Sequence, residues 1–214
     1  MLDVSLPFGR CFCIHAQLQF IDIAMQSLML HHGVLNSPLA VVPEEPSAGL
    51  RKTLNGIEAV RTELREIFRS ARRRHITLMR IHIGSTPHRP SHVYELPVSI
   101  CDAHDSTHQN CGECCEQLSD SEQRVLHRRF FTSFPVHEQT KTPHDRMFFF
   151  IHTTPEVINE NLEEADLDTA GFESKTRKIR LVHEGCDRQM ENPACDVKTM
   201  EWLRLVPFIV AAKE

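Results

Sequence analysis

The chain has 214 residues, of which 41% are hydrophobic and 25% charged, and this composition is typical of a globular protein with one sizeable core. The formal net charge of -5 argues against a protein that binds nucleic acid or membranes through overall positive charge. Because the chain start lacks the pattern of a secretory signal peptide, the eight Cys are expected to be reduced thiols inside a cell.

The first third of the chain predicts two helices. Apolar residues recur at helical spacing over residues 14–31 and also occupy other faces, which indicates a core helix that ends at Gly33. Residues 36–49 are rich in Pro and are predicted to form a loop, with a short edge strand over Leu39–Val42. Residues 54–71 predict an amphipathic helix, whose following basic run, residues 72–75, is interpreted as a solvated helix end.

The middle third predicts a hairpin and a third helix. Residues 76–83 and 92–100 are two strand-like runs joined by a turn-rich link. Ser119 and Glu122 have the spacing of a capping box at the start of a helix over residues 119–134. Its buried face is predicted to consist of Val125, Leu126, Phe130 and Phe134.

Residues 146–164 are the stretch around which the rest is organised. The unbroken apolar run Met147–Ile151 predicts a strand that is buried on both faces. Thr153, Pro155 and Glu156 then carry the signals of a helix start. A short acidic helix is therefore expected to follow, with apolar positions at Val157, Ile158, Leu162 and Ala165.

After residue 164 the pattern weakens. Residues 166–178 and 183–196 are polar and loop-like, residues 179–182 form a short strand candidate, and residues 197–212 are strand-like with an interruption at Pro207. The predicted fold class is therefore α+β, with three long helices packed on an antiparallel sheet and a long C-terminal segment.

Cysteines in the loop 101–115 suggest a zinc hypothesis. Cys111 and Cys114 have the spacing with which two thiolates hold one tetrahedral ion, and Cys101, Cys115, His104 or His108 would complete the site. Because the usual second Cys-x-x-Cys pair is absent, a polar surface insertion with reduced thiols is favoured. No metal and no other cofactor is therefore expected.

Enzyme motifs are missing. The sequence has no His-Glu-x-x-His, phosphate loop, nucleophile elbow or dinucleotide fingerprint, and its 14 His are scattered. His152 follows the central strand and would be the candidate base, but a hydrogen-bonded structural His is the favoured interpretation. The chain is therefore not expected to be an enzyme.

The order of these elements resembles the HORMA domain family, and within it the branch of non-catalytic HORMA subunits of translesion DNA polymerase zeta. Two stretches carry the resemblance: MFFFIHTTPEVINENLEE at residues 147–164, and Val-Lys-Thr-Met at residues 197–200. Residues 20–34 resemble the first helix of that branch. The resemblance covers roughly residues 14–214 and implies an N-terminal extension (1–13), a HORMA core (14–163) and a C-terminal safety belt with closing strands (164–214).

The resemblance also implies site residues. Ile179 and Leu181 fall where the family uses a Trp and a Leu to hold a partner peptide. The family's Tyr on the second helix has no counterpart here, and Ile57 is the position assigned to it. Lys198, Thr199 and Met200 would anchor the belt. Trp202, Phe208 and Val210 would form a surface for a second partner, although Phe208 and Val210 do not match the family's residue types and ordinary packing is the alternative for Trp202 and Phe208.

The implied function is that of a nuclear HORMA adaptor in DNA damage tolerance and repair. It would capture a peptide of a polymerase catalytic subunit under the belt, and it would also bind a scaffold translesion polymerase. Contact with DNA would be made only through these partners, and no contact with membranes is expected. The family also allows a dimer of HORMA chains. The alternatives are an adaptor of the spindle checkpoint or of autophagy initiation, and a zinc-binding interaction protein.

Overall fold

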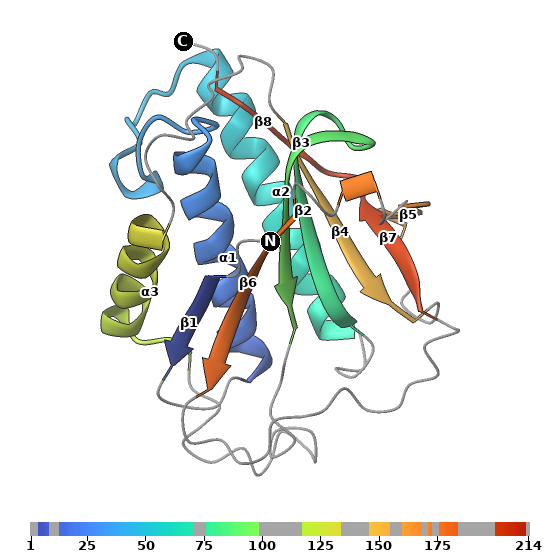
Figure 1. The fold of residues 1–214 in the computed structure, drawn as a ribbon. Coiled ribbons are helices and arrows are strands. Elements are labelled where there is room, and N and C mark those ends of the chain that lie inside the picture. Colours follow the sequence, from blue (N-terminus) through green and yellow to red (C-terminus); the bar gives the residue numbers. More distant parts are fainter. Residues whose placement is uncertain are drawn as a thin grey trace.

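Three α-helices and an eight-stranded, mixed sheet make up the described part of the chain, which is an α+β fold (Figure 1). This computed structural model describes residues 4–8, 13–70, 76–98, 117–133, 146–154, 160–167, 171–172, 176–183 and 200–212. The predicted α+β class is confirmed. No helix in these ranges is long and apolar enough to cross a membrane.

The first helix, α1 (Ile14–His31), forms as the apolar spacing predicts and is buried on several sides. The helix ends at His31, and Gly33, two residues later, has a φ of 65° that suits a residue without Cβ. Directly after the helix, the buried His32 ring makes a 2.7 Å hydrogen bond with the Tyr94 hydroxyl. Burial, together with the neighbouring His92 and His31, lowers the pKa of His32 to about 3, so the ring is neutral at neutral pH. This contact fixes the end of α1 to the sheet.

The second helix, α2 (Ala48–Ser70), begins six residues before the predicted start at Leu54. The cause is Ser47, whose hydroxyl oxygen accepts a 3.3 Å hydrogen bond from the Leu50 N–H and so caps the first turn. The prediction of an edge strand at Leu39–Val42 is wrong. Residues Leu39–Val41 form a 3-10 helix, η1, because Pro38 fixes the backbone for a tight turn that the Val41 N–H closes on the Pro38 carbonyl.

The third helix, α3 (Asp120–Ser133), has the predicted capping box. The Ser119 N–H donates to the Glu122 carboxylate at 2.7 Å, and the Glu122 N–H donates to the Ser119 hydroxyl at 3.4 Å. Leu126 and Phe130 are buried as predicted, whereas Val125 is 48% exposed, contrary to the prediction. The buried stripe runs through positions four residues apart, and Val125 lies about 100° around the helix from Leu126.

The centre of the sheet consists of three antiparallel strands, β2 (Ile76–Thr86), β3 (Arg89–Pro97) and β4 (Arg146–Thr153). The hairpin of β2 and β3 and the central strand β4 confirm the sequence predictions. Every residue from Met147 to Ile151 is buried, so β4 is covered on both faces.

The remaining strands extend this centre to both sides, in the order β1-β6-β3-β2-β4-β7-β5, with β8 also paired to β4. They are β1 (Val4–Phe8), β5 (Leu162–Glu164), β6 (Thr176–His183), β7 (Glu201–Leu205) and β8 (Ile209–Val210). The predicted antiparallel pairing holds for most of the sheet, but β6 runs parallel to both β3 and β1, so the sheet is mixed. Alternation along a strand shows which face is buried but not in which direction the neighbouring strand runs.

Two short elements differ from the sequence analysis. The predicted acidic helix does not extend over Leu162–Glu164, which form β5 instead because their backbone pairs with β7 and Glu163 forms an ion pair with Arg204. Residues 155–159 of that prediction lie outside the described residues. The strand β1 was not predicted, although Val4, Leu6 and Phe8 alternate with less apolar positions, which is typical of a strand.

The core lies between the helices and one face of the sheet (Figure 1). From Met79 to Ile83 in β2 and from Met147 to Ile151 in β4, odd-numbered residues, such as Ile81 and Phe149, face this core, while even-numbered residues, such as Arg80 and Phe150, face the opposite side. A second, smaller cluster covers that side and contains Phe148, Phe150 and Leu167, with Ala165 and Trp202 packed against it.

The close contact between α2 and β8 gives a test of this packing. A Cβ on Gly56 would lie 2.9 Å from the Phe208 carbonyl oxygen and 3.4 Å from the Ile209 Cα. Gly56→Ala is therefore expected to destabilise the protein by about 1 kcal/mol, since the overpacking exceeds the gain in helix propensity. Chemical denaturation measures this change. The control Asn55→Ala, at an exposed neighbour, should be neutral or stabilising, and a stabilised Gly56→Ala variant would show that the contact is loose.

Candidate functional site

The chain after residue 160 supplies strands to both edges of the central β3-β2-β4 sheet. First β5 lies beyond β7 on the β4 side, then β6 pairs with β3 on the opposite edge, and finally β7 and β8 pair with β4 again. The chain therefore crosses from one edge of the central sheet to the other and returns (Figure 1). A segment with this course holds the central strands between its own strands.

Strand β6 has two different neighbours along its length. Its first residues, Thr176–Lys178, pair with Val93–Glu95 of β3. Its later residues, Ile179–His183, pair on the other edge with Val4–Phe8 of β1. The pairing with β3 thus stops after Lys178, where β1 takes over as the partner of β6. The extended backbone of β1 occupies the edge of β6 that faces away from the central sheet.

The two residues predicted to hold a partner peptide lie next to β1. Ile179 is fully buried in the core and is the register partner of Val4. Leu181 is partly buried, packs against the same core and is the register partner of Leu6. Both side chains point toward the helix side of the sheet, and both lie beside β1.

The third predicted peptide contact, Ile57, lies elsewhere in the core. It is 2% exposed on α2, and its helix packs against β8 at the opposite side of the central sheet from β1. Ile57 shares the core cluster with Ile179 and Leu181, but the elements that carry these residues flank different edges of the central sheet. The structure thus brings Ile179 and Leu181 together with β1, and it places Ile57 on α2, the helix that packs against β8.

Leu167 and Phe172 lie on the face of the sheet opposite the helices. Leu167 packs on Phe148 and Phe150, and the Phe172 ring meets His82 edge-on at 5.3 Å. His82 is also 4.5 Å from the Phe150 ring, and its Nδ1–H donates to the Pro87 carbonyl at 2.8 Å. Burial lowers the pKa of His82 to about 4, so this aromatic contact is made by a neutral ring.

A buried polar cluster on the same face was missed by the sequence analysis. Arg80 of β2 forms a buried ion pair with Glu95 of β3, and Lys178 of β6 lies 3.8 Å from the same carboxylate. The Arg80 guanidinium also stacks over the Trp202 ring at 4.4 Å. The cluster thus connects β2, β3, β6 and β7. Its signal in the sequence was limited to charges in otherwise apolar strands.

The surface assigned to a second partner contains one exposed aromatic residue. Phe208 is 37% exposed, and its ring lies 5.5 Å from Phe148 and under the Arg146 guanidinium. Val210 is half-buried, and its carbonyl accepts a 2.8 Å hydrogen bond from Thr53. Trp202 is half-buried between Arg80 and the His152 ring, so packing accounts for most of its contacts. Met200 directly precedes β7, while Lys198 and Thr199 lie outside the described residues.

His152, the candidate base of an enzyme, has a structural environment. Its Nδ1 is 3.0 Å from the Thr77 hydroxyl, its ring lies 4.9 Å from Trp202, and burial lowers its pKa. Within the described ranges no group of His, Cys, Asp or Glu is arranged to hold a metal ion. The zinc candidates Cys101, Cys111, Cys114 and Cys115 lie outside those ranges.

The sequence was compared with protein-family models and with curated proteins. Neither a protein-family model nor a curated protein matches the sequence.

Proposed function

We propose that this protein is a HORMA adaptor that captures a partner peptide with its C-terminal segment, as an accessory subunit of a translesion DNA polymerase. The observation that carries the proposal is the course of that segment, which supplies strands to both edges of the central sheet. A belt that closes over a bound peptide has to pass from one edge of the central sheet to the other. The sequence resemblance at residues 147–164 and 197–200 supports the assignment to the polymerase branch.

In the proposed mechanism the peptide binds as an extended strand. Backbone hydrogen bonds to β6 supply affinity, and the side chains of Ile179 and Leu181 select apolar residues of the peptide. Because β1 occupies this edge of β6, capture exchanges β1 for the partner strand. The belt then slows release, since the peptide leaves only after the segment opens.

The remaining roles follow from the same proposal. The protein acts in the nucleus, performs no catalysis itself, and reaches DNA through its polymerase partner. Phe208 and Arg146 provide the exposed part of a surface for a second polymerase. Co-purification with a peptide of a translesion polymerase catalytic subunit supports this function. Retention of spindle-checkpoint or autophagy peptides instead would assign the protein to another HORMA branch.

Leu181→Ala tests the peptide site. Truncating this partly buried side chain removes about 1.5 kcal/mol or more of apolar contact, so the partner peptide should dissociate roughly tenfold faster. Surface plasmon resonance with an immobilised peptide measures the rate. The matched control is Val182→Ala, because Val182 is the next residue of β6, points to the other face and is 39% exposed. Equal off-rates for the two variants would remove Leu181 from the site.

Point substitutions are the better test because a deletion of the belt also damages the core. Ile179, Leu203, Leu205 and Ile209 all belong to the main core cluster. A chain that ends at residue 163 would expose their partners to solvent, and loss of capture would then have two causes.

A further inference from the structure

A cavity of about 550 Å³ lies between α1, the turn that leads into η1, and α3, on the helix side of the molecule. This volume is within the range of about 300–1,000 Å³ that small-ligand sites occupy. The cavity is separate from the β6 edge to which peptide binding is assigned.

Apolar side chains form most of the cavity wall. Leu30 comes from α1, Leu35 from the turn, Leu39 from η1 and Phe130 from α3. Phe131 also lines the cavity and is 73% exposed, so it stands at the mouth. Such a wall binds the apolar body of a ligand by removing it from water.

The charged and titratable side chains in the lining all belong to basic residues. They are His31, His127 and Arg128, and the lining contains no Asp or Glu. Arg128 carries a permanent positive charge. Among the described residues, its side chain forms no ion pair. A ligand for this cavity should therefore carry a negative charge next to its apolar body.

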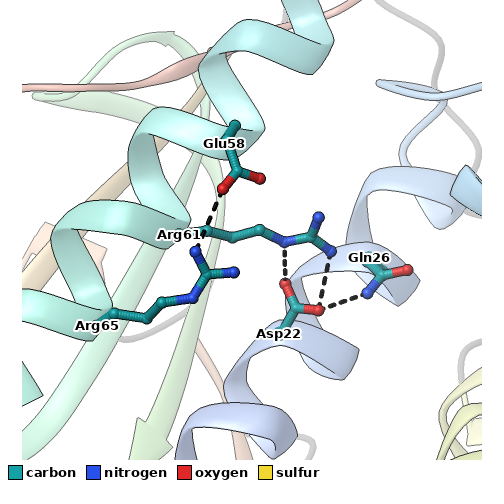
Figure 2. Close-up of polar contacts among 5 residues, drawn as sticks. All are labelled: Asp22, Gln26, Glu58, Arg61 and Arg65. Atoms are coloured by element: carbon teal, nitrogen blue, oxygen red, sulfur yellow. Dashed lines mark hydrogen bonds and ion pairs between the residues drawn. The ribbon is translucent and has the colours of Figure 1, made fainter.

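A carboxylate behind the wall, that of Asp22, is already paired with a guanidinium. Asp22 of α1 accepts hydrogen bonds from the Arg61 guanidinium at 2.6 and 2.9 Å, as Figure 2 shows. Asp22 also accepts a 2.7 Å hydrogen bond from the amide of Gln26, a residue of the cavity wall (Figure 2). Arg61 thus pairs with the charge of Asp22, although the field of this carboxylate still reaches the wall residue His127, whose pKa is lowered by burial and raised to a smaller extent by Asp22.

We propose that this cavity binds a small amphiphile with an apolar body and a single carboxylate. The body lies among Leu30, Leu39 and Phe130, and the carboxylate accepts hydrogen bonds from Arg128 at the mouth. The volume and the enclosure by three elements favour a small molecule over a protein segment.

Calorimetric titration of the full chain with decanoate tests this, with decan-1-ol as the uncharged probe of matched length. We expect one decanoate per chain and about fivefold weaker binding of the alcohol, the difference that one exposed charge contact provides. Equal binding of the acid and the alcohol, or no decanoate binding up to its solubility limit, would overturn the proposal.

Three variants locate the binding. Arg128→Gln should remove the preference for the acid, whereas Arg124→Gln, one turn away on α3 and outside the lining, should retain it. Ala40→Trp places a large ring into the cavity from an exposed position and should abolish binding of both probes. Unchanged decanoate affinity in Ala40→Trp, or a retained preference in Arg128→Gln, would refute the assignment. Circular dichroism checks that each variant is folded.

Discussion

Replacement of Glu95 by Gln is expected to lower the free energy of unfolding by about 3–5 kcal/mol, because it leaves a buried cation without its counter-charge. The Arg80 and Glu95 side chains are only 6% and 9% exposed, and an Arg80 Nη2–H donates to a Glu95 carboxylate oxygen. The Arg80 Nε and Nη1 atoms are buried without a hydrogen-bond partner, so Glu95 is the group that compensates this guanidinium. A neutral amide retains the shape but not the charge.

Urea denaturation measures this loss, provided that the slope of the unfolding free energy with urea stays constant. Lys178→Met is the control on the same cluster. Lys178 is 31% exposed and 3.8 Å from Glu95, so its removal should cost at most about 1 kcal/mol. The double variant Arg80→Met/Glu95→Leu should recover most of the stability, since it removes both charges. A cost below about 1 kcal/mol for Glu95→Gln would show that water reaches Arg80.

The sequence predicts well those elements whose signals are local. The spacing of apolar residues located α1, and the capping box at Ser119 located the start of α3. The apolar run of β4 predicted a strand covered on both faces. Neighbouring side chains of a strand point to opposite faces, so five consecutive apolar residues indicate that both faces are buried.

Elements that depend on distant partners were harder to predict. Leu162–Glu164 follow helix-start signals, but they form a strand because β7, about 40 residues later, offers a backbone to pair with. The parallel direction of β6 is likewise set by tertiary pairing with β3 and β1. Arg80 and Glu95 look like solvent-facing positions in alternating strands, and only the structure shows that this face is covered.

The candidate site likewise separates what local sequence signals predict from what depends on distant contacts. Ile179 and Leu181 were placed by resemblance, and the structure locates them beside β1, a strand that the sequence analysis left in an N-terminal extension. Ile57, chosen as the nearest position to a missing Tyr, lies on α2, which packs against β8 at the other edge of the central sheet. A numbering offset assigns positions along one strand, but it does not show which elements lie side by side in space.

The two faces of β4 belong to different clusters, and Phe149 lies on the face that packs in the main core, toward the helices. It is fully buried in the main core and is the register partner of Ile81. Phe149→Ala is therefore expected to lower the free energy of unfolding by about 3–5 kcal/mol, since it opens a cavity where no neighbour can collapse without moving a central strand.

Phe131→Ala serves as the matched control, because Phe131 is 73% exposed and should change stability by no more than about 0.5 kcal/mol. Chemical denaturation of both variants gives the comparison. A loss below about 1.5 kcal/mol for Phe149→Ala would mean that the core repacks around β4. A large loss places the stability of the fold in the contact between β4 and the helices.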